Sequence, residues 1–142
     1  MALELIDLPL GHPGWELALP VLRELRPDLT AAALEKVLAQ GAPQGLRFLG
    51  AFADERCLGV AGWRLMVTTS VLRKLYVDDL VATGRARSQG VGATLLRELE
   101  RRAREAGCRA LELDSGVQRF AAHRFYLRER MDINAHHFAK TL

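Results

Sequence analysis

The chain has 142 residues, of which 49% are hydrophobic and 26% are charged, a composition typical of one folded domain and unlike that of a disordered chain. The formal net charge of +3, from 20 basic and 17 acidic residues, is too small an excess to indicate a nucleic-acid-binding protein. The acidic N-terminus and the lack of a long apolar run lead us to expect a cytoplasmic protein with neither a signal peptide nor a membrane anchor.

The first 45 residues predict one short strand and two helices. Apolar residues recur at helical spacing from Trp15 to Leu25, and Pro27 ends this pattern because the residue before a proline avoids helical angles. Thr30 is a suitable N-cap for a second helix. The predicted elements are residues 2–6, 15–25 and 31–40.

Residues 46–81 predict strands. Two apolar runs, residues 46–52 and 57–66, are separated by a short polar turn at Asp54 and Glu55, which indicates an antiparallel hairpin. Residues 71–81 form a third apolar run and predict a longer strand.

The remaining chain predicts alternating helices and strands. Residues 91–106 have an apolar and a charged face and end at Gly107, as an amphipathic helix does. The strand over 75–81, the helix over 91–106 and the strand over 109–114 then predict a strand–helix–strand crossover, which is right-handed and parallel. The later elements are a strand over 109–114, a helix over 119–130 and a last strand over 133–138.

The start of the helix at residue 91 predicts an anion site. The first N–H groups of a helix have no backbone partner, and the helix dipole makes them electropositive. Gly90 and Gly92 leave these groups uncovered, and Arg85 and Arg87 add positive charge nearby. We therefore expect a ligand that carries a diphosphate or triphosphate.

Two common phosphate-binding patterns do not fit this segment. A dinucleotide site needs a third glycine in G-x-G-x-x-G directly after a first strand, and here that glycine is missing and the crossover comes late. A P-loop needs a lysine after its last glycine, which this chain lacks.

Residues 87–92, Arg-Ser-Gln-Gly-Val-Gly, match [QR]-x-x-G-x-[GA], which resembles the coenzyme-A-binding motif of the GNAT superfamily of N-acetyltransferases. Residues 122–126, Ala-His-Arg-Phe-Tyr, resemble the A-x-x-[FY]-Y segment of that family. The family usually continues with Gly-Phe, where this chain has Arg130 and Met131. The resemblance therefore does not predict the conformation of the turn after this helix.

The order of elements resembles this family along nearly the whole chain. The resemblance implies an α/β (α+β) fold with a single GNAT-like domain over residues 1–142. Its mixed, mainly antiparallel sheet would have six or seven strands, flanked by about four helices, with a central parallel β-α-β crossover. It also implies that residues 15–40 build the side that receives the acceptor.

The resemblance implies that acetyl-CoA is the co-substrate and that no metal takes part. Backbone N–H groups of the glycine turn would hold the pyrophosphate, and the end of the strand before it would pair with the pantetheine arm. A splay between that strand and residues 109–114 would admit the thioester. The implied cofactor-binding residues are Leu80, Val81, Ala82, Arg87, Ser88, Gln89, Gly90, Val91, Gly92, Ala93 and Phe125.

The implied reaction is direct transfer of the acetyl group to a primary amine. Tyr126 would act as the acid that protonates the leaving thiolate, and a strand N–H near Leu80 would stabilise the oxyanion. Asp78 and Asp79 are our candidates for the base, although alternation on a strand predicts that they point to opposite faces unless a bulge intervenes. The other open candidates for the base or for attracting the amine are Glu112, Asp114, His136, His137 and a water chain.

The two cysteines, Cys57 and Cys108, have no metal-binding spacing and are expected to be buried free thiols outside the cleft, which leaves no nucleophile for an acyl-enzyme. The acceptor is expected to be a small molecule or a peptide, with no nucleic-acid or membrane partner and a possible homodimer. A second hypothesis is a non-catalytic acyl-CoA-binding regulatory module. Nucleic-acid binding by the arginine-rich face of the helix over 91–106 is disfavoured because Glu98, Glu100 and Glu105 interrupt it.

Overall fold

The structure, a computed structural model, describes residues 2–142, except for the side chain of Ser88. The described chain divides into two compact units, of which the first ends at Glu112 and the second comprises residues 113–142. The expectation of a single domain stays a prediction.

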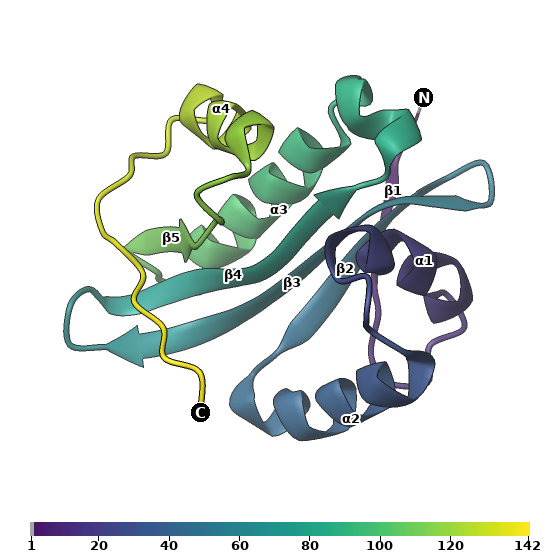
Figure 1. The fold of residues 1–142 in the computed structure, drawn as a ribbon, viewed down its shortest axis with the longest axis horizontal. Coiled ribbons are helices and arrows are strands. Elements are labelled where there is room, and N and C mark those ends of the chain that lie inside the picture. The colour runs from purple at the N-terminus through teal and green to yellow at the C-terminus, as the bar shows by residue number, and fades with distance from the viewer. Residues whose placement is uncertain (1) are drawn as a thin grey trace. The chain divides into compact units, whose positions relative to one another are not determined.

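The elements follow the predicted order closely (Figure 1). The helices are α1 (Trp15–Leu25), α2 (Ala31–Gly41), α3 (Val91–Glu105) and α4 (Phe120–Arg128), with short 3-10 helices η1 (Ala42–Gln44) and η2 (Gly84–Gln89). The strands are β1 (Glu4–Asp7), β2 (Arg47–Ala53), β3 (Arg56–Thr68), β4 (Leu72–Ala82) and β5 (Ala110–Leu113).

In the described residues the strands form one five-stranded sheet in the order β1-β2-β3-β4-β5, so the prediction of six or seven strands was wrong. The pairs from β1 to β4 are antiparallel, and the arrows of β4 and β5 point the same way on either side of the α3 crossover (Figure 1). The missing element is the predicted strand over residues 133–138, which is neither helix nor strand. An apolar pattern shows what a strand could bury, but a strand also needs a hydrogen-bonding neighbour, which the pattern does not supply.

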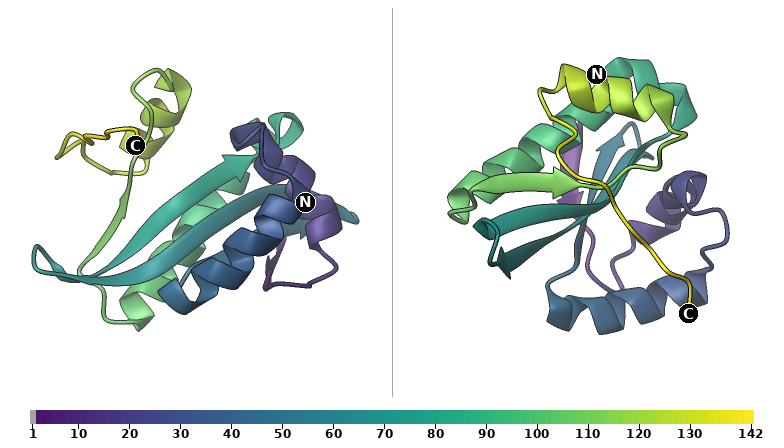
Figure 2. Two further views of the ribbon diagram at one scale, coloured as in Figure 1. Left: turned by 60° about the horizontal axis from the view of Figure 1, so that its bottom comes forward. Right: turned by 60° about the vertical axis from the view of Figure 1, so that its left-hand side comes forward.

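The helices of the first unit lie on opposite faces of the sheet, with α1 and α2 on one face and α3 on the other (Figure 2). On the α3 face, Gly59 permits close packing, because a Cβ at that position would lie 2.7 Å from Val91 and 2.9 Å from Leu95. The sheet therefore has a buried core on each face.

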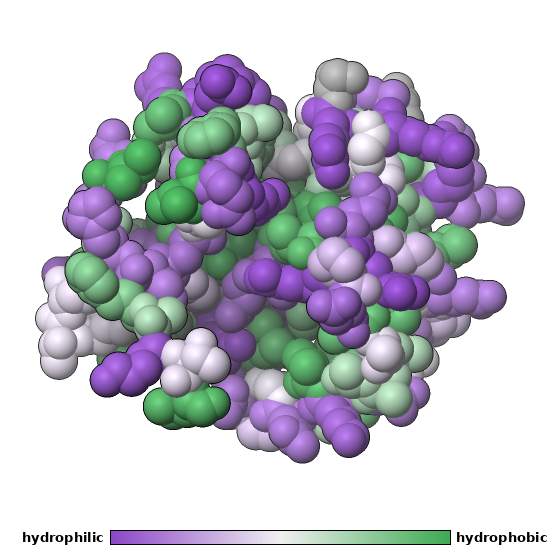
Figure 3. Space-filling view, viewed as in Figure 1, coloured by the Kyte–Doolittle hydropathy of each residue, from purple (hydrophilic) through white to green (hydrophobic). Residues whose placement is uncertain are grey.

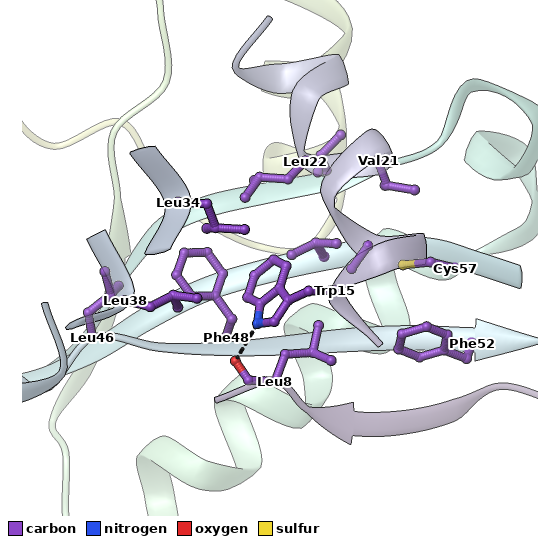
Figure 4. Packing of buried hydrophobic residues seen from close by; sticks show 13 residues of the cluster. Leu8, Trp15, Val21, Leu22, Leu34, Leu38, Leu46, Phe48, Phe52 and Cys57 are labelled. Atoms are coloured by element: carbon purple, nitrogen blue, oxygen red, sulfur yellow. Dashed lines mark hydrogen bonds between the residues drawn. The ribbon is translucent and has the colours of Figure 1, made fainter. Parts of the chain in front are cut away.

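The core on the α1–α2 face is centred on Trp15 and Phe48, whose rings meet edge to face with centroids 5.2 Å apart (Figure 4). The indole Nε1 of Trp15 donates to the carbonyl oxygen of Leu8 at 3.1 Å, so this buried donor is satisfied. This cluster fixes α1 and α2 on the sheet and so sets the position of the loop between them.

The second unit contains α4 and the chain after it. The helix ends in a left-handed turn in which Arg130 has φ +66°. Met131 N donates to Tyr126 O at 3.0 Å and Arg130 N donates to Leu127 O at 3.1 Å, the bond pattern of a Schellman motif. The turn for which the resemblance led us to expect glycine therefore forms here with arginine. Among the described residues, no helix is both long enough and apolar enough to cross a membrane.

Candidate functional site: the coenzyme turn and the bulged strand

The glycine turn has the geometry that the sequence predicts. Gly90 has φ +77°, lies at the N-cap of α3, and is followed at once by the first helical turn. No described side chain caps the N–H groups of that turn. Thr94 donates its backbone N–H and its hydroxyl to the carbonyl oxygen of Gly90, each at 3.0 Å, and so leaves those N–H groups unused. The N–H groups at the start of α3 are therefore available to an anion, and we call residues 83–92 the coenzyme turn.

Glu24, near the end of α1, holds the start of the coenzyme turn. Its carboxylate accepts a hydrogen bond from Thr83 Oγ1 at 2.6 Å and another from Gly84 N at 3.0 Å. It also lies 3.9 Å from the guanidinium of Arg87, whose Nε donates to Ala82 O at 3.3 Å. Glu24 could not be identified from the sequence, because a solvent-facing glutamate on a helix does not indicate a hydrogen-bond partner some 60 residues away.

The end of β4 directs some of its backbone groups away from β3. Thr83 N donates to Leu58 O of β3 at 2.8 Å, and every second residue of an antiparallel strand directs its N–H and C=O to the same neighbour. Leu80 and Ala82 therefore direct these groups away from β3. On that other side Arg109, just before β5, donates its N–H to Arg73 O near the start of β4 at 2.9 Å, and β5 has four residues where β4 has eleven. β5 is therefore much shorter than β4, and the splay that the resemblance implies between them stays a prediction.

A β-bulge brings both candidate aspartates to one face of the sheet. In the β3–β4 register Gly62 is opposite Asp79 and Trp63 is opposite Val77, so Asp78 is an extra residue. Asp79 therefore points to the α1–α2 face, where it meets Arg26, and Asp78 meets Arg64 on the same side. Simple alternation, which predicts opposite faces, is wrong at this pair.

Three carboxylates of the sheet, those of Asp78, Asp79 and Glu112, are each paired with a cation. Asp78 uses both oxygens for Arg64, at 3.0 Å to Nε and 3.1 Å to Nη2. Glu112 accepts from Lys74 Nζ at 2.7 Å. Asp79 uses Oδ1 for Nε of Arg26 at 2.8 Å, and its Oδ2 accepts no hydrogen bond from the described residues.

Arg26 joins the end of α1 to the bulge of β4. Besides the pair with Asp79, its Nη2 donates to Asp78 O in the bulge at 3.2 Å. It follows α1 directly, so it ties the α1–α2 loop to the bulged strand. In the sequence Arg26 was identified only as part of a helix stop, and its role depends on the register of β3 and β4.

Tyr126 and Phe125 lie on α4 in the second unit, with ring centroids 5.3 Å apart. Burial raises the pKa of the Tyr126 phenol above its ordinary value, against the opposing effect of the charge and hydrogen bond of Arg119. The phenol is therefore protonated at neutral pH. In the same unit, His137 Nδ1 lies 3.7 Å from Asp114 Oδ1, and His136 is exposed.

The cysteines differ from one another. Cys57 is buried, and burial raises the pKa of its thiol to about 11, although a hydrogen bond to Gly59 O at 3.3 Å opposes this. Cys108 is only half-buried, so the expectation that both are buried was wrong for that residue. The thiol of Cys57, with its raised pKa, is therefore a poor nucleophile at neutral pH.

The profile of the Acetyltransferase (GNAT) family matches residues 15–131, which is most of the chain and includes both the coenzyme turn and α4. The chain belongs to the GNAT family of acetyltransferases. It is an acetyltransferase, and the family typically uses acetyl-CoA.

Curated relatives agree with this membership. An uncharacterized N-acetyltransferase of Bacillus subtilis (strain 168), YhdJ, is 31% identical over 113 residues, which are 79% of this chain and 80% of that protein. An aminoalkylphosphonate N-acetyltransferase of Salmonella typhimurium is 39% identical over 66 residues, but these are 46% of this chain and 43% of that protein.

Solved structures agree on the fold. An aminoglycoside N-acetyltransferase crystallised with CoA has a TM-score of 0.84 at 15% identity, covering 99% of this chain and 95% of that one. An acetyltransferase of Trypanosoma brucei has a TM-score of 0.81 at 20% identity, covering 99% and 100% of the two chains. The GNAT-like fold is therefore confirmed, with five strands in the described residues.

Proposed function

We propose that the protein transfers the acetyl group of acetyl-CoA directly to a primary amine, within one functional domain. The observation that carries the proposal is the uncapped start of α3 behind Gly90, next to a β4 edge whose backbone groups point away from β3. These two features suit an extended chain that ends in a diphosphate. The family match runs through both units, which supports a single domain.

The residues present fit acetyl-CoA at this place. Backbone N–H groups of Gln89, Gly90, Val91, Gly92 and Ala93 would hold the diphosphate, with Arg87 and Ser88 beside them. Leu80, Val81 and Ala82 would pair with the pantetheine arm, and Phe125 would pack against it. The bound co-substrate supplies an activated acyl group on a good leaving group.

The bulged strand would receive the amine. An amine with a pKa near ~10.4 is protonated at pH 7 and must lose a proton before it attacks. Asp79, with one carboxylate oxygen free of described partners, would attract the ammonium and accept or relay this proton. Asp78 would contribute by holding Arg64, since both of its oxygens are already engaged.

The remaining steps need an oxyanion donor and an acid. The N–H of Leu80, directed away from β3, would donate to the oxyanion of the tetrahedral intermediate. The carbon–sulfur bond then breaks, and Tyr126 would give its proton to the leaving thiolate. A phenol kept protonated by burial suits this role.

The test is a screen of primary amines with acetyl-CoA in which released thiol is measured. The Tyr126→Phe variant should lose about 10²-fold in kcat, since removal of a general acid has an effect of that order, while CoA binding by calorimetry is retained. Tyr76→Phe is the matched control, because Tyr76 is the other tyrosine of the chain. If CoA binds but no amine releases thiol, the protein is instead a non-catalytic acyl-CoA-binding module.

A further inference from the structure

An open groove of about 540 Å³ lies among the end of α1, the α1–α2 loop, α2 and the sheet. This volume is in the range of small-molecule sites. Three of its residues, Leu22, Leu34 and Phe48, lie on the α1–α2 face of the sheet (Figure 4). The apolar walls are formed by Leu22, Leu25, Leu29, Leu34, Val37 and Phe48.

The groove carries little charge. Its charged lining residues are Arg26, Asp28 and Asp79, so two carboxylates and one guanidinium leave one net negative charge. Arg26 already holds Oδ1 of Asp79, whereas Oδ2 of Asp79 and the carboxylate of the exposed Asp28 accept no hydrogen bond from the described residues. On the face viewed in Figure 3, hydrophilic and apolar residues are intermixed.

These charges favour one kind of amine. An acceptor with three or more ammonium groups would bring at least one of them beside the apolar walls with no carboxylate to meet it, which is costly. An acceptor with an anionic group would meet only Arg26, whose guanidinium is engaged by Asp79. One ammonium on an apolar body contacts the walls and pairs with the half-buried Asp79, while the exposed Asp28 stays in water.

Building on the proposed function, we infer that the acceptor is a primary monoamine attached to an apolar alkyl or aryl group. The apolar group packs among Leu29, Leu34, Val37 and Phe48, and the ammonium lies at Asp79. This substrate class differs from the aminoglycosides and aminoalkylphosphonates that appear in the names of similar proteins.

The experiment is a series of n-alkylamines from butylamine to heptylamine, compared with kanamycin and 2-aminoethylphosphonate, with released thiol as the readout. Each added methylene that enters the groove should raise kcat/KM about fourfold, the value that corresponds to burial of one methylene. Kanamycin and 2-aminoethylphosphonate should both have kcat/KM at least about tenfold below that of heptylamine.

A matched pair of variants locates the effect. Val37 lines the groove and is 40% exposed, whereas Leu17 is 45% exposed on α1 and lies outside it. Val37→Ser should lower kcat/KM for heptylamine several-fold, through KM, and leave the dissociation constant of CoA unchanged. Leu17→Ser should change neither quantity.

The outcomes separate the two proposals. A flat alkylamine series, or a higher kcat/KM for kanamycin or the phosphonate, overturns this inference and leaves acetyl transfer standing. If no amine releases thiol, the proposed function fails. Calorimetry of heptylamine with the CoA-saturated protein then tests whether the groove binds an apolar amine. Binding that Val37→Ser weakens supports the inference, and the absence of such binding overturns it.

Discussion

Replacing Glu24 by alanine should weaken CoA binding about fivefold. The carboxylate holds the coenzyme turn through Thr83 Oγ1 at 2.6 Å and Gly84 N at 3.0 Å, so its removal frees the segment that leads to the anion site. The two hydrogen bonds are charge-assisted, and such bonds contribute up to about 1.5–3 kcal/mol each when buried. The side chain of Glu24 is 34% exposed, so we take about 1.5–2 kcal/mol for the two together.

An opposing effect must be subtracted. Glu24 lies 3.9 Å from Arg87, and its negative charge also repels an incoming diphosphate. Interactions between exposed charges contribute about 0–1 kcal/mol. Removal of the Glu24 charge therefore favours CoA binding by less than the loss of its two hydrogen bonds disfavours it. The net weakening of about 1 kcal/mol corresponds to roughly fivefold in Kd.

The assay is titration calorimetry of CoA with three variants at one ionic strength. Glu24→Gln keeps an acceptor oxygen without the charge, so its Kd should stay within about twofold of the original protein. Glu16→Ala, an exposed residue at the start of the same helix, is the control and should have no effect. CoA binding by Glu24→Ala that is as tight as, or tighter than, that of the original protein would refute the idea that Glu24 orders the turn.

Two further predictions concern stability. Arg130→Gly should raise the free energy of unfolding by up to about 1 kcal/mol in urea, because Arg130 has φ +66°, a region that glycine enters without the Cβ penalty; an unchanged midpoint would argue against strain at that turn. Hydrogen bonds from Arg101, and also from Arg102, hold the pKa of Glu98 at about 2 although burial opposes them. A lowered pKa gives stability that is present above the ordinary value of 4.5 and is lost as the pH falls toward 2, so the stability difference between the original protein and Glu98→Gln should shrink over that interval. Parallel pH profiles for the two proteins would contradict this.

The parts of the site that the sequence could predict are local. The coenzyme turn depends on Gly90, on the helix after it and on the strand before it, all within a few tens of residues. The sequence predicts each of them separately, from the glycine, from the amphipathic pattern and from the apolar run. At Arg130 the expected glycine is absent, yet the chain forms a helix-ending turn with a positive φ, closed by hydrogen bonds from the N–H groups of Arg130 and Met131.

The parts that the sequence could not predict depend on pairing between distant segments. Asp78 and Asp79 share a face because β3 and β4 slip by one residue at Gly62, and no pattern within β4 reveals that slip. Arg26 and Glu24 acquire their partners only when α1 packs on the sheet. The predicted strand over residues 133–138 failed for the same reason, since its apolar residues do not specify a neighbouring strand.

The most direct test of the account is the affinity of the folded protein for CoA and its dependence on the start of α3. Calorimetry should detect binding of CoA. Gly90→Val should weaken that binding at least about tenfold, because a β-branched residue resists φ +77° and displaces the N–H groups behind it. Gly107→Val is the matched control, since Gly107 has φ +75° at the other end of the same helix. If CoA does not bind, or if Gly90→Val and Gly107→Val bind it equally well, the proposed site at the head of α3 is contradicted.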